Sequence, residues 1–278
     1  MPFQPQPGHF YRMPIFFGPM PGPREWPEGR DFDFRTTPRM TMIGVRMLTN
    51  ADQLTAMLPD RFELRGAPVV TVELNYMTEI GWLAGRGYNL CDVKFEVTYH
   101  AKSGPVNGTL VLVRWENLCD PILSGREELG HNKLYCEIPE PRFVDERRSV
   151  RLSWLDTPFM DLSVTGLTPI PGVTRPKVDP DHHGMLSYKY IPRTGSWGEA
   201  DVEYVTLSPP DEMRKNMTIT NFEVGTGEFA FRRCTWDELP TLYRIVNAFA
   251  ELENHGFQGA HLLQTLGGSS IAETVRLD

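Results

Sequence analysis

Lys133 lies where a glycine-containing turn gives way to an apolar run, in the stretch SGREELGHNKLYCEIPEP that begins at Ser124. A lysine near its reference pKa of about 10.4 is protonated at neutral pH and cannot attack a carbonyl. Burial disfavours the charged form and can lower the pKa by several units. The neutral amine then forms an iminium with a ketone, which accepts electrons from a breaking C–CO₂, C–C or C–H bond. The alternative is a solvated surface charge, because lysines are rarely buried.

A second stretch, VELNYMTEIGWLAGRGYN, combines two carboxylates with two phenols around a Gly-rich bend; these are Glu73, Glu79, Tyr76 and Tyr88. The groups that flank an iminium decide its reaction. A carboxylate and an arginine near the leaving group favour decarboxylation. Tyrosine hydroxyls near a second carbonyl favour aldol chemistry, because a proton donor must serve an alkoxide. The chain is richer in tyrosine than in charge here, which favours the aldol reaction.

Together the two stretches resemble the acetoacetate decarboxylase family, in which a Gly-Arg-Glu stretch precedes the Schiff-base lysine by six residues. Gly125-Arg126-Glu127 and Lys133 have this spacing. The resemblance covers roughly residues 35–255 and includes Val72-Glu73 and the later segment Tyr188-Lys189-Tyr190-Ile191-Pro192. It implies a lyase that needs no metal or organic cofactor, acts on a small keto acid and forms a homo-oligomer.

The chain departs from the family pattern at two places. The decarboxylase has a second lysine after the first, whose charge helps to lower the pKa of its neighbour, and Leu134 stands at that position here. The family's acid/base glutamate has no clean match near the Gly-rich bend, where Tyr88 is the nearest functional side chain. Glu73 matches a second family carboxylate, and the arginine that binds the substrate carboxylate falls near Arg39.

These considerations give a candidate site. The expected catalytic residues are Lys133, Tyr88, Glu73 and Tyr243, and the expected substrate-binding residues are Arg39, Arg126, Tyr76 and His131. Structural alternatives stay open for several of them, and Arg126, with Glu127, can serve only to brace the loop. Glu73 can form an internal ion pair with Arg126, and Tyr243 lies on an amphipathic helix, where a tyrosine more often packs than reacts.

The predicted function is pyruvate-type aldolase or dehydratase chemistry through a lysine iminium, since members of the superfamily with this pattern are pyruvate aldolase-dehydratases. The partners are a small keto acid and, for the aldol reaction, an aldehyde. Two alternatives remain. One is decarboxylation of acetoacetate or a similar β-keto acid. The other is a non-catalytic barrel that binds a small apolar ligand, which the loss of the second lysine and of the acid/base glutamate favours.

Other site motifs are absent or weak. The sequence has no G-x-S-x-G, P-loop or H-E-x-x-H motif, and Gly85-Arg86-Gly87 lacks the strand–helix crossover of a dinucleotide site. His182 and His183 follow two aspartates, but a Pro-rich loop with no further spaced ligand favours a solvated segment over a metal site. No metal is expected.

Charge and cysteine usage limit the partners and the compartment. The formal net charge is −8 and no basic cluster interrupts it, so neither nucleic acid nor an anionic membrane is an expected partner. The four cysteines are scattered, which predicts reduced thiols in a cytoplasmic protein. The N-terminal region has no uninterrupted apolar stretch typical of a signal peptide.

Hydrophobic patterning predicts a mostly β (α+β) protein. Short apolar or alternating runs recur from Met40 to Leu207, separated by turn signals, and one amphipathic helix follows the capping box of Thr235 and Glu238. We expect a single large antiparallel domain over residues 35–278, a closed or nearly closed β-barrel or cone with a few peripheral helices. Residues 1–34 are Pro/Gly-rich and aromatic, which predicts an extended arm that docks on a body or a neighbouring subunit.

Overall fold

The computed structural model describes residues 2–9, 11–15, 35–175, 179–210, 215–268 and 274–277. Most of the expected N-terminal arm, including its aromatics Phe10, Phe16, Phe17 and Trp26, lies outside these ranges. One described arm residue contacts the body, because the Arg12 guanidinium forms an ion pair with the Glu128 carboxylate.

The body is built on one large sheet, with strands in the order β14-β11-β10-β5-β4-β3-β1-β13-β12-β9-β8-β7. Two further short strands lie outside this linear order: β2 pairs with β4, and β6 pairs with β5. The strands span β1 Arg39–Leu48, β2 Phe62–Leu64, β3 Val69–Ile80, β4 Arg86–Ala101, β5 Gly104–Glu116, β6 Lys133–Tyr135, β7 Arg142–Val144, β8 Arg147–Trp154, β9 Thr157–Pro169, β10 Met185–Pro192, β11 Ala200–Ser208, β12 Thr218–Phe231, β13 Phe257–Leu266 and β14 Val275–Arg276.

The mostly β prediction is confirmed, but the sheet is neither closed nor purely antiparallel. β14 and β7 are its two free ends. β4 pairs with one edge of β5 along its whole length, and along the other edge β5 pairs in parallel with β10 and, further along, with β6. The pairing with β6 arises because the chain leaves β5, forms helical turns and returns beside it, a connection that the alternation of single strands does not reveal.

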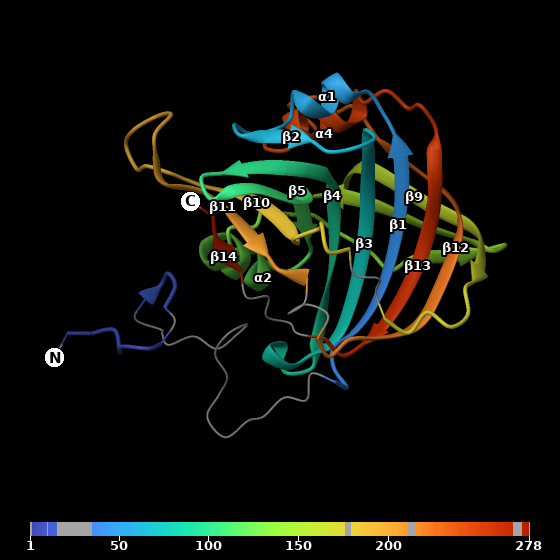
Figure 1. The fold of residues 1–278 in the computed structure, drawn as a ribbon, viewed down its shortest axis with the longest axis horizontal. Helices are drawn as coiled ribbons and strands as arrows, with labels where there is room; N and C mark the ends of the chain where they lie inside the picture. The colour runs from blue at the N-terminus through green and yellow to red at the C-terminus, as the bar shows by residue number, and fades with distance from the viewer. Residues whose placement is uncertain are drawn as a thin grey trace.

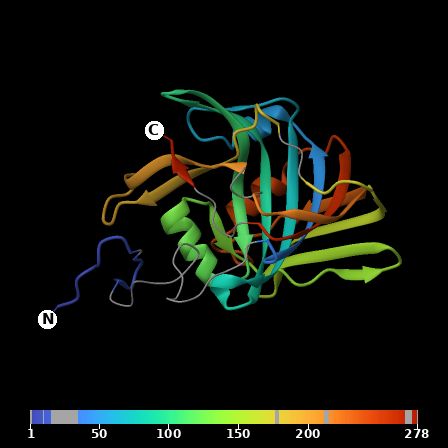
Figure 2. The ribbon, with the colours of Figure 1, turned by 60° about the horizontal axis from the view of Figure 1, so that its bottom comes forward.

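The sheet curls so that distant strands meet across an apolar core (Figure 1). Trp115 of β5 packs against Phe159 of β9 with ring centroids 5.3 Å apart, although β4, β3, β1, β13 and β12 separate the two strands in the sheet. Trp115 also meets Phe231 of β12 and Phe249 of a late helix. These aromatic side chains are part of the apolar core on one face of the sheet. The hairpin of β8 and β9 projects on the side opposite the two termini (Figure 2).

Helical segments are short and peripheral, as expected. They are α1 Ala51–Thr55, the single turn η2 Gly81–Leu83, α2 Cys119–Ser124, the π-turn η3 Gly125–Leu129 and α4 Tyr243–Ala250. The capping-box contact forms, since Thr235 N–H donates to Glu238 Oε2 at 2.8 Å. The helix nevertheless begins only at Tyr243, after a series of turns.

None of the helices in the described part of the chain is long and apolar enough to cross a membrane. All four cysteines are free thiols, consistent with the prediction of reduced cysteines.

Candidate active site

Lys133 is a buried lysine, with 5% of its surface exposed. It opens β6, and its Nζ lies 2.8 Å from Glu116 Oε1 and donates to the carbonyl oxygen of Pro121 at 2.8 Å. Burial lowers the pKa of Lys133, and the Arg114 guanidinium lowers it further, against the opposing attraction of Glu116. A larger share of the amine is therefore neutral, and so nucleophilic, than for a lysine in water.

The Gly-Arg-Glu stretch shapes the space in which this lysine lies. A Cβ on Gly125 would approach Lys133 Cε to 2.3 Å and Nζ to 2.5 Å, so only glycine leaves room for the amine here. The Arg126 guanidinium donates to the Lys133 carbonyl at 2.8 Å and holds the start of β6. The carbonyl of Glu127 accepts a hydrogen bond from Lys189 Nζ at 2.6 Å, which ties the turn to β10.

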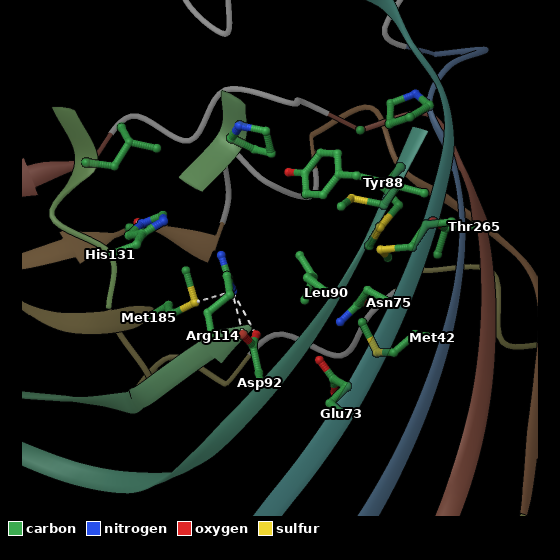
Figure 3. A pocket seen from close by; sticks show the side chains of 18 of the residues that line it. Met42, Glu73, Asn75, Tyr88, Leu90, Asp92, Arg114, His131, Met185 and Thr265 are labelled. Carbon is green, nitrogen blue, oxygen red and sulfur yellow. Dashed lines mark hydrogen bonds and ion pairs between the residues drawn. The ribbon is translucent and has the colours of Figure 1, made fainter. Parts of the chain in front are cut away.

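The Lys133 side chain reaches a cavity of about 480 Å³ on the sheet face opposite the Trp115 core. Side chains alternate between the two faces of a strand. The cavity therefore receives every second residue of the central strands, as Figure 3 shows for part of its wall. Its polar and charged lining comprises Glu73, Asn75, Tyr88, Asp92, Lys94, Thr109, Arg114, Ser124, His131, Lys133, His182, Ser208 and Thr265.

Arg114 and Asp92 form a bidentate ion pair in the cavity wall (Figure 3). Arg114 Nε lies 2.6 Å from Asp92 Oδ1, and Nη2 lies 2.7 Å from Oδ2 and 3.3 Å from the Met185 sulfur. Burial disfavours the guanidinium, but Asp92 outweighs that effect and raises the pKa of Arg114. Arg114 is therefore a permanent buried cation, and Arg114 and Lys133 are paired in the register of β5 and β6.

Tyr88 of β4 points into the same space as Arg114 (Figure 3). Burial raises the pKa of its hydroxyl, and the nearby Glu116 carboxylate raises it further. The phenol is therefore protonated throughout the neutral range and can donate a proton or a hydrogen bond to a group in the cavity.

Glu73 forms an ion pair, but with Lys94 and not with Arg126. Its Oε1 lies 2.6 Å from Lys94 Nζ, and its Oε2 lies 3.7 Å from His261 Nε2. Burial alone would raise the pKa of Glu73, but Lys94 and His261 lower it well below its usual range. The alternative of a Glu73–Arg126 pair is therefore wrong, because Arg126 is occupied by the Lys133 carbonyl.

The remaining expected residues divide between the cavity and other places. His131 lines the cavity, with its Nε2 3.3 Å from Ser208 Oγ. Tyr76 points to the opposite face of β3, where its hydroxyl donates to the Pro139 carbonyl at 3.2 Å. Arg39 is half exposed and pairs with Glu79 at 2.9 Å. Tyr243 contacts Arg244 on α4. None of Arg39, Arg126, Tyr76 and Tyr243 lines the cavity of Lys133.

Sequence reasoning missed four charged groups: Asp92, Lys94 and Arg114 line the cavity, and Glu116 contacts the amine. A signal was present, because Arg114 and Glu116 stand in or directly after the apolar strand sequence TLVLVRW. A charge inside a buried strand requires a partner. Sequence spacing does not identify these partners. Asp92, the partner of Arg114, is on another strand, and Lys133, the partner of Glu116, follows a crossover.

Comparison with known protein families shows to which family the chain belongs. The family described as acetoacetate decarboxylase (ADC) matches residues 12–250. The chain belongs to this family. Among curated proteins, no sequence matches it.

Solved structures share the family fold at low sequence identity. The acetoacetate decarboxylase from Legionella pneumophila subsp. pneumophila str. Philadelphia 1 has a TM-score of 0.63 and 18% identity, with 92% of this chain and 94% of that chain covered. The enduracididine biosynthesis enzyme MppR, complexed with the condensation product of pyruvate and imidazole 4-carboxaldehyde, has a TM-score of 0.60 and 15% identity, with 87% and 90% covered. At such identities the similarity establishes the fold alone.

Proposed function

We propose that the protein is a Schiff-base-forming lyase that uses Lys133 to bind a small keto acid as an iminium. The observation that carries the proposal is the placement of a buried lysine at the wall of a cavity, with its pKa lowered by that burial. A surface lysine would remain protonated and unreactive towards ketones. Membership of the family supports the same chemical class.

Arg114 is the proposed binding partner of the substrate carboxylate. Its Nε and Nη2 are committed to Asp92, while the guanidinium faces the cavity. A guanidinium has five N–H donors, so the bidentate pair with Asp92 leaves further donors for a second carboxylate. In an α-keto acid the carboxylate is attached to the carbon that bonds to Lys133. A cation on the neighbouring strand is suitably placed for that geometry.

Tyr88 is the proposed proton donor of the carbon–carbon bond-forming step. Loss of a methyl proton from the pyruvate iminium to water gives a neutral enamine, whose carbon attacks the aldehyde carbonyl and so regenerates the iminium. The aldehyde oxygen then takes a proton, which the protonated phenol can supply. Glu73 is better suited to neutralising Lys94 than to accepting the methyl proton, because a carboxylate with a strongly lowered pKa is a weak base.

The proposed aldol reaction is supported by the similarity to MppR, whose bound ligand is a condensation product of pyruvate and an aldehyde. Decarboxylation of a β-keto acid is the second candidate, and the similarity to the Legionella acetoacetate decarboxylase favours it. Both reactions pass through an iminium at Lys133. They differ in the bond that breaks or forms next, so the iminium must be tested before the reaction.

Borohydride trapping tests the iminium directly. The protein is incubated with pyruvate or with acetoacetate, reduced with borohydride and analysed by mass spectrometry of the intact chain and of its peptides. We expect a covalent adduct on Lys133 that is absent in Lys133→Ala. The exposed lysine variant Lys102→Ala is the matched control and should be labelled like the parent protein.

Product analysis then separates the candidates. With pyruvate and imidazole 4-carboxaldehyde, the aldolase function predicts a condensation product; with acetoacetate, the decarboxylase function predicts acetone and CO₂. If neither keto acid labels Lys133 at saturating concentration and neutral pH, the lyase proposal is wrong. The fold would then serve as a binding cavity for an apolar ligand.

A further inference from the structure

Glu116 is fully buried behind Lys133, with none of its surface exposed. Its Oε1 lies 2.8 Å from Lys133 Nζ. No other group in the described part of the chain donates a hydrogen bond to either carboxylate oxygen. A buried carboxylate usually has several donors, because it loses the water that would stabilise its charge. Among the residues that the structure describes, the Lys133 amine is thus the one direct neighbour with which Glu116 can exchange a proton.

We propose that Glu116 is the catalytic acid of Schiff-base formation: it supplies the proton that leaves with the substrate oxygen as water, and its carboxylate then balances the charge of the iminium. The inference rests on the proposed function, since it requires that Lys133 forms an iminium. Glu116 touches a reacting atom, Lys133 Nζ, although it does not itself line the cavity.

The step balances in atoms and charge. The neutral amine of Lys133 adds to the keto carbon and, after a proton moves from nitrogen to oxygen, gives a neutral carbinolamine. One further proton is needed to expel the hydroxyl group as water, and the Glu116 carboxylic acid provides it. The products are an iminium cation, a Glu116 carboxylate and one water molecule, from one amine, one carboxylic acid and one carbonyl.

Burial of the pair supports this starting state. Burial raises the pKa of Glu116 and lowers the pKa of Lys133, so both effects favour a proton on the carboxyl and a neutral amine. The other charged or titratable groups facing Glu116 are Arg114 on its own strand, and Asp92 and Tyr88 on β4. Arg114 and Asp92 neutralise each other through their bidentate pair.

The net charge of the buried cluster explains why a carboxylate is needed. Without Glu116, the iminium would add a second cation beside Arg114 in a region from which water is excluded. An uncompensated buried charge is strongly unfavourable. With Glu116, the cluster of Asp92, Arg114, Glu116 and Lys133 keeps the same total charge before and after the iminium forms. The positive charge that appears on the Lys133 nitrogen is matched by the negative charge left on Glu116, whose proton leaves in the water molecule.

Glu116→Gln tests the assignment, because the amide keeps the size of the side chain but holds no transferable acidic proton. The rate of borohydride-trappable iminium formation with pyruvate is measured by rapid quench across a pH series. We expect this rate to fall by about 10²–10⁴-fold, the usual contribution of general acid–base catalysis. We also expect Glu116→Ala to be partly rescued by formate, which can occupy the vacated space and carry the proton.

The pH profile distinguishes a proton donor from a merely structural neighbour. The parent protein reacts when the pair of Glu116 and Lys133 holds one proton, so its rate should fall on both the acidic and the alkaline side. Glu116→Gln should keep the acidic decrease and lose the alkaline one. Glu116→Asp, which restores the acid, should regain part of the rate and the alkaline decrease.

Each outcome decides the assignment. An unchanged rate and profile in Glu116→Gln would overturn it, as would a parent protein whose rate shows no alkaline decrease. The pH profile of the parent protein needs no variant, so it tests the assignment even if Glu116→Gln does not fold. If the parent protein itself is not labelled at Lys133, the proposed function fails and this inference fails with it. If Lys133 is labelled in the parent protein and at the same rate in Glu116→Gln and Glu116→Ala, this inference alone is wrong and the proposed function stands.

Discussion

Arg114 and Lys133 are register partners on the parallel strands β5 and β6, so a permanent cation lies beside the buried amine. The family pattern places a second lysine after the first, and Leu134 takes that position here. In this structure the neighbouring cation is Arg114, on the adjacent strand, and not a lysine next in the sequence. Arg114 contributes to the lowered pKa of Lys133, although burial is the larger cause.

Gly125→Ala should disable the lysine without unfolding the protein. The new Cβ would lie 2.3 Å from Lys133 Cε, so the amine must move. A displacement of about 1 Å can cost about 10²-fold in rate, and we expect a loss of that order in borohydride labelling by pyruvate. Leu123→Ala, an exposed change in α2, is the control. Labelling of Gly125→Ala at the parent rate would show that the amine does not need its observed position.

Replacing the pair of Arg114 and Asp92 should remove the preference for keto acids. The double variant Arg114→Met with Asp92→Asn avoids leaving one buried charge alone, which costs about 3–5 kcal/mol. We expect pyruvate to label Lys133 with about 10- to 100-fold lower affinity, in line with the loss of a charged hydrogen bond. Acetone, which has no carboxylate, should be affected far less, because the two removed charges act on the pKa of Lys133 in opposite directions.

The matched control for that experiment is the exposed pair of Arg151 and Asp161, whose Nε and Oδ1 lie 2.8 Å apart. Arg151→Met with Asp161→Asn removes the same chemical groups outside the cavity and should leave both labelling reactions unchanged. If the Arg114 double variant still prefers pyruvate over acetone, another cation of the cavity binds the carboxylate.

Tyr88→Phe should separate iminium formation from the later step. The variant lacks the phenolic proton, so we expect condensation of pyruvate with imidazole 4-carboxaldehyde to slow by about 10²–10⁴-fold. Lys133 should still be labelled by pyruvate and borohydride. Tyr243→Phe, on α4 and outside the cavity, serves as the control with the same atom removed. Equal condensation rates in the two variants would exclude Tyr88 as the donor.

Removing the buried amine and its carboxylate should stabilise the fold. Lys133→Met with Glu116→Gln replaces two buried ionisable groups, and such replacements are often neutral or stabilising by about 1–4 kcal/mol. Lys133→Met alone should gain less, because Glu116 then loses its partner. Urea unfolding at several pH values measures the effect, and a double variant less stable than the parent at neutral pH would contradict it.

The sign of the pH dependence follows from the two pKa directions. The pKa of Lys133 is lowered by folding, so its cost to stability is present below about 10.4 and disappears as the pH rises to that value. The pKa of Glu116 is raised, so its cost appears as the pH rises above about 4.3. Both costs are present between these limits, and the double variant should gain most near neutral pH.

The sequence by itself determined the family and the mostly β class of fold. The spacing of Gly125-Arg126-Glu127 and Lys133 pointed to the family, and alternation along single strands indicated a mostly β protein, because strand periodicity is a local property. Tyr88 and His131 were also expected at the site, and both line the cavity. These inferences needed no information about which strands are neighbours.

The tertiary structure decided which charges surround the amine and how the sheet is connected. Asp92, Arg114 and Glu116 meet Lys133 because β4, β5 and β6 are neighbours in the sheet. Arg39 lies away from the cavity because its chain neighbours Pro38 and Met40 line it and alternate side chains take opposite faces, and Tyr243 lies on α4 outside it. Strand order, parallel pairing and the open ends of the sheet depend on contacts between distant segments, which local patterns do not encode. The lowered pKa of Lys133 is likewise a tertiary property, because burial is its main cause and only the folded chain buries the amine.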